Sequence, residues 1–283
     1  MSDAHDAPHS PRADHAVPSA PAAPSGAVAP SVRVVRHGPA RPGAPVLVCF
    51  PHAGGGASAF RRWPGALPDG AELELWAVQP PGREERADEP CLTDFGELLA
   101  ATAASVGEVV AGRPYAFFGH SVGSVLAFEL AREARRRGER LPEALAVSAF
   151  PAPHTLVPHA LDGIPDKAIL DFLSGLSYAF ADGQAPPPRL VEEFLPVLRA
   201  DFSAVSSYAF ADEAPLPCPL HVFCGSVDRF VRPAELHKWD AYTDGEFALH
   251  VLRGGHFYLN QHAAGILEIL GTHLTAHSLT QEV

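Results

Sequence analysis

Short, fully apolar runs alternate with longer segments of helical periodicity along most of this chain. Residues 45–50 (PVLVCF) are apolar on both faces, as strands buried inside a parallel sheet are. Further runs of this kind lie at 73–78, 115–118, 144–150, 220–224 and 247–252, and helical segments fit between them at 92–110, 124–137 and 263–276. The alternation predicts an α/β fold, with a mainly parallel central sheet flanked by helices.

The first 31 residues follow a different pattern. They consist almost entirely of Ala, Pro, Ser, His and Asp, and they show neither helical nor strand periodicity. Such a segment cannot bury enough apolar surface to offset the entropy lost on ordering. Residues 1–31 are therefore predicted to form a disordered tail.

A second segment, residues 151–217, has no convincing strand and divides the predicted core into 32–150 and 218–283. It is predicted to be a helical lid inserted into the core, with helices at 166–176 and 189–208. Its aromatic residues, among them Phe172 and Phe202, either line a substrate channel or simply pack a peripheral helical hairpin. Phe172 and Phe202 are the predicted substrate-binding residues.

Composition and charge narrow the function. The 283 residues are 47% hydrophobic and carry a net charge of −12, which argues against a nucleic-acid partner. No apolar stretch is long enough to span a membrane, and the N-terminus has no signal-peptide pattern. The four cysteines form no CxxC motif, so we expect reduced thiols and a cytoplasmic protein.

The strongest chemical motif is Gly119-His120-Ser121-Val122-Gly123, between an apolar strand and a helical segment. In a nucleophile elbow, small residues two before and two after the serine allow a strained turn that exposes the hydroxyl. Ser121 is therefore the predicted nucleophile, although a Gly-rich turn between strand and helix can also be purely structural.

A nucleophilic serine needs a base and an acid that orients the base. Asp228 follows the apolar run 220–224, and His256 follows the run 247–252 on a Gly-rich loop. Their order after Ser121 is the one found in α/β-hydrolases. Asp228 and His256 are thus predicted to complete a triad, with Asp201, Asp212 and Asp240 as alternative acids.

The oxyanion hole is predicted to use the backbone amides of Val122 and Ala53, with Gly54 as the next choice. The glycines after residue 50 also fit a dinucleotide-binding fingerprint. However, the next strand lacks the acidic residue that would hold a ribose. We therefore expect no cofactor, and no metal.

Several motifs together resemble the type II thioesterases that accompany polyketide and non-ribosomal peptide synthetases. They are FPHAGG (50–55), PPGREER (80–86), FFGHSVG (117–123), FLPVLRADF (194–202), GSVD (225–228) and GGHFYL (254–259). The resemblance implies an α/β-hydrolase fold with an inserted helical lid, and Ser121, Asp228 and His256 as the triad. The chain departs from the family pattern at Val122, where a methionine is usual, and in its longer N-terminal extension.

The resemblance also implies the reaction. The expected function is hydrolysis of acyl groups from the phosphopantetheine arm of carrier proteins, which edits or releases intermediates, and small acyl thioesters should also be substrates. The alternatives are a carboxylesterase or lipase acting on oxygen esters, and a binding protein on a hydrolase fold. Two basic pairs, Arg61 with Arg62 and Arg83 with Arg86, are the predicted docking residues for the carrier protein. The arginines at 132 and 135–137 are expected to pair with Glu129 and Glu133 instead.

Overall fold

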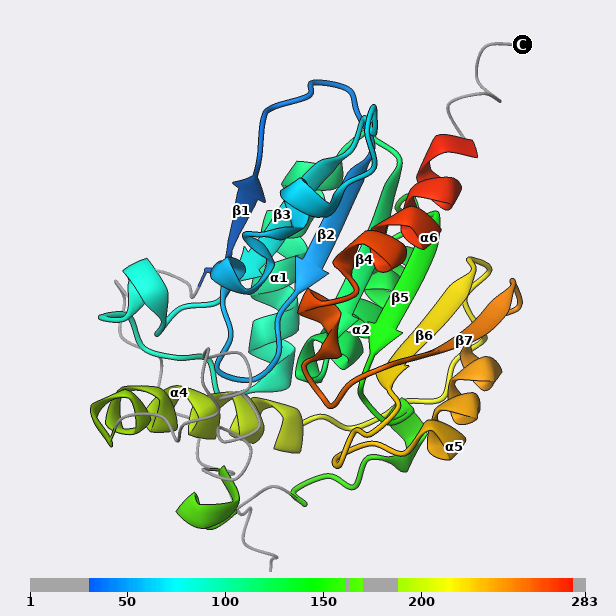
Figure 1. Ribbon diagram of the computed structural model, residues 1–283. Coiled ribbons are helices and arrows are strands. Elements are labelled where there is room, and N and C mark those ends of the chain that lie inside the picture. The colour runs from blue at the N-terminus through cyan, green and yellow to red at the C-terminus, as the bar shows by residue number, and fades with distance from the viewer. Residues whose placement is uncertain (1–30, 161–162, 170–187, 277–283) are drawn as a thin grey trace, which may run out of the picture.

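A seven-stranded sheet forms the centre of the computed structural model, which describes residues 31–160, 163–169 and 188–276 (Figure 1). Phe172 and, apart from Ser31, the predicted tail lie outside these residues. All six predicted strands are present and parallel to one another: β2 (Val46–Phe50), β3 (Glu74–Gln79), β4 (Tyr115–His120), β5 (Ala144–Ser148), β6 (Leu220–Gly225) and β7 (Phe247–Leu252).

One strand was not predicted. β1 (Arg33–His37) pairs antiparallel with β3 and begins the sheet order β1-β3-β2-β4-β5-β6-β7. Its sequence RVVRH is short, contains two arginines and is only partly buried, so it lacks the continuous apolar run that marks the other strands.

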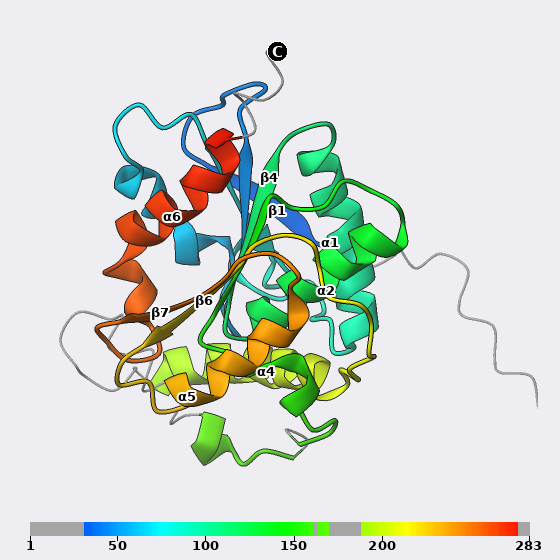
Figure 2. The same ribbon diagram turned by 90° about the vertical axis from the view of Figure 1, so that its right-hand side faces the viewer.

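Helices cover both faces of the sheet (Figure 2). On one face, α1 (Phe95–Val110) and α2 (Val122–Arg136) lie side by side. On the other face lies α6 (Ala263–Ala276). Successive residues of β2 pack against helices on opposite faces of the sheet. Val48 belongs to the same apolar cluster as Phe128 of α2, whereas Leu47 belongs to the cluster that contains Ile266 of α6. This arrangement confirms the predicted α/β class.

The carboxyl ends of the parallel strands point to one edge of the sheet, and α4 (Pro188–Ser206) lies across that edge (Figure 1). It occupies most of the second helix predicted in the lid. Of the first predicted lid helix, only residues 166–169 are described, and they are helical. A short helix, α5 (Pro233–Leu236), follows β6. Short 3₁₀ turns occur at Ala57–Phe60, Trp63–Ala66, Glu84–Arg86, Pro153–Thr155, His237–Tyr242 and Tyr258–Asn260.

In the described part of the chain, no helix is both long enough and apolar enough to cross a lipid bilayer.

Candidate active site

Ser121 occupies the turn between β4 and α2, where the backbone has φ 53° and ψ −126°. This left-handed conformation is costly for any residue with a Cβ. Contacts around the turn leave no room for side chains, because a Cβ on Gly123 would lie 2.3 Å from the backbone oxygen of Phe50. A Cβ on Gly119 would lie 2.3 Å from the backbone oxygen of Gly123. The elbow therefore depends on both glycines flanking Ser121.

His256 and Asp228 meet at the same edge of the sheet. His256 Nδ1 lies 2.9 Å from Asp228 Oδ2, and the two side chains are 4% and 0% exposed. Asp228 Oδ1 also accepts hydrogen bonds from the backbone N–H groups of Phe230 and Val231, at 2.8 and 3.3 Å. The carboxylate is thus held in place while it orients the imidazole through Nδ1, which directs Nε2 away from the acid.

The imidazole of His256 lies close to the elbow. Its ring centroid is 5.2 Å from that of His120, the residue directly before Ser121. The structure therefore brings all three predicted triad residues to one edge of the sheet. Asp201, one of the alternative acids, instead forms an ion pair with Arg83.

Two further histidines flank the site, and both are held in the neutral form. Burial lowers the pKa of His52 to about 4, and burial also lowers the pKa of His120 well below its usual value. His120 Nδ1 lies 2.8 Å from Ser148 Oγ, which in turn lies 2.6 Å from the hydroxyl of Tyr258. At neutral pH these rings supply no charge to the site.

The loop after β2 carries the predicted oxyanion donors. The amide of Ala53 donates no hydrogen bond within the described residues, and Val122 is the first residue of α2, where an N–H has no partner inside the helix. Gly54, the second choice, is already engaged, because its N–H donates to Asp201 Oδ2 at 2.6 Å. Ala53 and Val122 remain the predicted pair.

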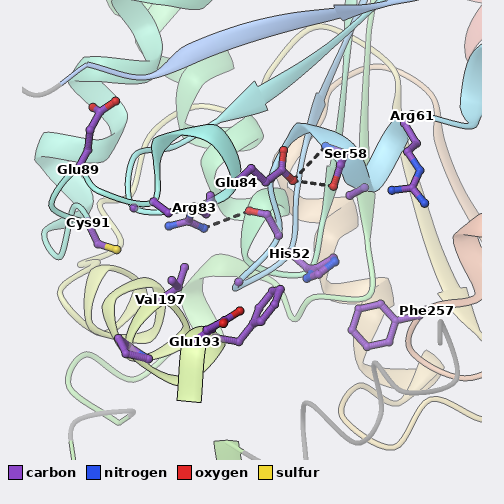
Figure 3. Close-up of a pocket in the computed structure, with 18 of the residues that line it drawn as sticks. His52, Ser58, Arg61, Arg83, Glu84, Glu89, Cys91, Glu193, Val197 and Phe257 are labelled. Carbon is purple, nitrogen blue, oxygen red and sulfur yellow. Dashed lines mark hydrogen bonds between the residues drawn. The ribbon is translucent and has the colours of Figure 1, made fainter. Parts of the chain in front are cut away.

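A cavity of about 900 Å³ lies beside this loop (Figure 3). Ser58, Arg61 and Glu84 lie on one side of it, and Glu193 and Val197 of α4 on the other. It extends to His52 and to Phe257, the neighbour of His256. Its volume is in the range of small-molecule sites. Phe202 is not among the described residues that line it, and instead packs against a cluster of Ala53, Ile169 and Leu198.

The predicted docking pair of Arg83 and Arg86 is wrong. Their side chains are only 5% and 2% exposed, so they are not available to a partner protein. Arg83 forms an ion pair with Asp201, and Arg86 forms one with Glu89. Both follow β3 at the expected edge of the sheet, but Arg83 turns inward to Asp201, and Arg86 donates to the backbone oxygens of Gln79 and Ser31. Arg61 and Arg62 are exposed and line the cavity.

Three of the four arginines at 132 and 135–137 pair with Glu129 or Glu133 as expected, and Arg135 pairs with Glu213 instead. Arg132 binds Glu129 at 2.7 Å, and Arg136 and Arg137 bind Glu133 at 2.8 and 2.7 Å. Glu213, from the segment before β6, adds ion pairs that were not predicted.

The ion pair between Arg83 and Asp201 was also missed. A signal for it was present, because Asp201 lies three residues after Leu198 and four before Val205, on the apolar face of a helix. A charged residue on such a face needs a buried partner.

Comparison with known proteins places these features in context. A family model described as thioesterase domain matches residues 45–274. The chain is 37% identical to the thioesterase PikA5 of Streptomyces venezuelae, over 84% of each chain. It is 34% identical to the gramicidin S biosynthesis protein GrsT of Aneurinibacillus migulanus, over 79% of this chain and 86% of that protein. The solved structure of the type II thioesterase BorB, from the borrelidin biosynthetic cluster, superposes with a TM-score of 0.76 at 38% identity and covers 86% of this chain and 97% of its own.

Proposed function

Because the chain belongs to the thioesterase family, we propose that it hydrolyses acyl groups from the phosphopantetheine arm of carrier proteins. Ser121, His256 and Asp228 form the proposed catalytic triad. The imidazole of His256, hydrogen-bonded to Asp228 and beside the turn of Ser121, carries this proposal. PikA5 is itself named a thioesterase, and BorB a type II thioesterase of a biosynthetic cluster. These relatives favour a thioester over a free oxygen ester.

The reaction proceeds in two halves. His256 Nε2 takes the proton of Ser121 Oγ, and the Ser121 oxygen attacks the thioester carbonyl carbon. Asp228 stabilises the imidazolium formed on His256 through its Nδ1–H. The amides of Val122 and Ala53 stabilise the oxyanion. The C–S bond then breaks, and His256 returns the proton to the pantetheine sulfur as the thiol leaves. In the second half, His256 deprotonates a water molecule that attacks the acyl-Ser121 ester, and the acid is released as Ser121 regains its proton.

The neutral state of His52 and His120 suits this chemistry. A protonated imidazole next to His256 would disfavour the imidazolium that forms during each half-reaction. Because burial lowers the pKa of both rings, His256 can gain a proton without a charged histidine beside it.

The carrier protein is proposed to dock at Arg61 and Arg62. Neither side chain forms an ion pair or hydrogen bond within the described residues, whereas Arg83 and Arg86 are both paired. The phosphodiester that joins pantetheine to its carrier is anionic, so two unpaired guanidinium groups at the cavity offer it a matching charge. Since the chain carries −12 overall, such attraction has to be local.

The remaining assignments are structural and cellular. Residues 151–217 are the proposed lid, of which α4 lies across the carboxyl ends of the strands (Figure 1). The proposed location is the cytoplasm, which is consistent with four cysteines that form no disulfide.

Mass spectrometry of acyl-loaded carrier proteins tests the function. The wild-type protein is expected to remove the acyl group, and Ser121→Ala is expected to leave it in place. An oxygen ester of the same acyl group serves as the competing substrate. Faster cleavage of the oxygen ester than of the carrier-bound thioester would favour the esterase alternative.

A charge reversal tests the docking site. The variant Arg61→Glu/Arg62→Glu is expected to lower kcat/KM for an acyl carrier protein about 10-fold or more and to weaken its salt dependence, while a small acyl thioester is hydrolysed as before. The matched control is Arg33→Glu/Lys238→Glu, which changes the charge equally at exposed positions outside the cavity. Equal losses in both variants, or on both substrates, would refute docking at Arg61 and Arg62.

A further inference from the structure

A buried carboxylate of the lid binds the loop that carries the predicted oxyanion donor. Asp201 lies in α4, and its Oδ2 accepts a hydrogen bond of 2.6 Å from the N–H of Gly54. The same carboxylate binds both terminal nitrogens of Arg83, at 2.6 and 2.7 Å. Two loops that follow different strands therefore meet on one side chain of the lid.

Arg83 extends this connection. Its guanidinium also donates to the backbone oxygen of Gly55 at 3.1 Å, a contact drawn in Figure 3. Burial alone would lower the pKa of Arg83, but the neighbouring Asp201 carboxylate outweighs it, and the pKa is raised. The side chains of Arg83 and Asp201 are only 5% and 11% exposed, so the ion pair is largely shielded from solvent.

The hydrogen bond to Gly54 fixes one specific peptide unit. The peptide between Ala53 and Gly54 is bound at its nitrogen by Asp201 and at its oxygen by His52, whose Nδ1 lies 2.9 Å from the oxygen of Ala53. Because His52 is neutral at pH 7, its Nδ1 carries the single N–H that makes this bond. These two bonds fix the peptide that follows the Ala53 Cα. The N–H of Ala53 belongs to the preceding peptide, whose oxygen, on His52, accepts a hydrogen bond of 2.9 Å from the N–H of Gly55.

Packing holds the loop from the same direction. Leu198, one helical turn before Asp201, forms an apolar cluster with Ala53. The backbone of Gly54 has φ +75°, and a Cβ there would lie 2.9 Å from Leu198 Cδ2. At Gly54 the loop is therefore in direct contact with Leu198 of α4.

The carboxylate also lies close to the elbow. Asp201 and Val122 line the same small cavity, of about 30 Å³. An unpaired negative charge there would oppose the negative charge that develops on the substrate oxygen. The ion pair with Arg83 removes this conflict.

We propose that Asp201 is a positioning residue of the oxyanion hole: it holds the Ala53–Gly54 peptide so that the amide of Ala53 faces Ser121, and Arg83 neutralises its charge. The inference rests on the proposed function for the role of Ala53. It adds that the lid takes part in catalysis through the loop it touches.

Steady-state kinetics with a short acyl thioester test this role. Asp201→Ala is expected to lower kcat by about 10- to 100-fold with KM changed less than about 3-fold, because the lost interaction acts mainly in the transition state. Asp201→Asn keeps an oxygen that can accept from Gly54 and should lose less. Arg83→Met leaves the carboxylate unpaired and should lose as much as Asp201→Ala.

The double variant Arg83→Met/Asp201→Asn separates positioning from structural support. It removes the unpaired charge while keeping an acceptor for Gly54, so its kcat is expected to exceed that of Arg83→Met several-fold. Removing the unpaired buried charge would also restore stability, so the Tm of both variants is measured, and positioning requires that kcat recovers at a temperature well below both Tm values. The matched control is Glu129→Gln, which breaks the buried ion pair with Arg132 in α2, and should lower the Tm without a comparable loss of kcat.

All variants are assayed well below their Tm. The rate at which a fluorophosphonate labels Ser121 is measured in parallel, because this reaction depends on the oxyanion hole but does not require a thioester substrate. A kcat of Asp201→Ala within about 3-fold of wild type, or no gain in the double variant, would overturn the inference. If the wild type cleaves no thioester, the proposed function fails, and the ratios of labelling rates still test Asp201 on their own.

Discussion

Replacing Ser121 by glycine should stabilise the protein while abolishing its activity. The backbone at Ser121 has φ 53° and ψ −126°, a region in which a Cβ costs about 1–3 kcal/mol. Glycine removes that cost, but it also makes the unfolded chain more flexible, which lowers the free energy of unfolding by about 0.4–1 kcal/mol. The expected net effect is a stabilisation of about 0.5–2 kcal/mol.

The matched reference is Ser121→Ala, which loses the same hydroxyl but keeps the Cβ. Both variants should lose on the order of 10⁴- to 10⁶-fold in kcat, so activity does not distinguish them, and their stabilities should. For a domain of this size, the difference corresponds to a rise in Tm of roughly 1–8 °C for the glycine variant.

Urea denaturation and thermal unfolding of the two variants provide the measurement. A glycine variant that is no more stable than the alanine variant would refute the idea that the elbow stores strain at Ser121. It would also remove the physical reason given for this turn as the position of the nucleophile.

Four further predictions follow from the described contacts. Asp228→Asn should lower kcat on a short thioester by up to about 10⁴-fold, because it favours the wrong tautomer of His256; near-normal kcat would identify another acid. Gly123→Ala should cost about 3 kcal/mol in urea denaturation, since its Cβ would lie 2.3 Å from a backbone oxygen of β2; unchanged stability would contradict the close packing. Phe202→Ala should alter the ratio of kcat/KM between long and short acyl thioesters by a factor equivalent to about 1–3 kcal/mol; an equal loss on both would make Phe202 a packing residue only. Burial lowers the pKa of His221 to about 4, so the unfolded chain binds the extra proton first as the pH falls through 6.5, and His221 alone should lower the free energy of unfolding by about 2 kcal/mol between pH 7 and pH 5, in addition to the contributions of His52 and His120; His221→Gln should reduce the slope of the free energy of unfolding against pH, and an unchanged slope would exclude a contribution from His221.

The sheet could be predicted from the sequence because its six parallel strands are buried on both faces, which requires continuous apolar runs. β1 escaped prediction because it is an edge strand with two arginines, and its pairing with β3 depends on the rest of the sheet. The order of Ser121, Asp228 and His256 along the chain was equally visible, since the carboxyl ends of parallel strands meet at one edge.

Side-chain partners that are distant in sequence could not be predicted in the same way. Arg83 was placed at the correct edge of the sheet, but its partner Asp201 comes 118 residues later. Whether a cation at a strand end faces solvent or a buried carboxylate depends on how α4 packs, and local composition does not encode this. Arg61 and Arg62 have the same local character as Arg83 and Arg86, yet they are exposed.

The attachment of α4 to the loop after β2, at Gly54, limits how the proposed lid can be exchanged or lengthened. Each residue of an α-helix turns the chain by about 100°, so inserting or deleting one residue between Leu198 and Asp201 would rotate the carboxylate away from Gly54. Chimeras that import a lid from a relative should therefore place their junctions before Leu198 or import Asp201 together with its arginine. Length changes made before Leu198 leave Asp201 facing Gly54, so engineering of substrate range has the most freedom in that part of the proposed lid.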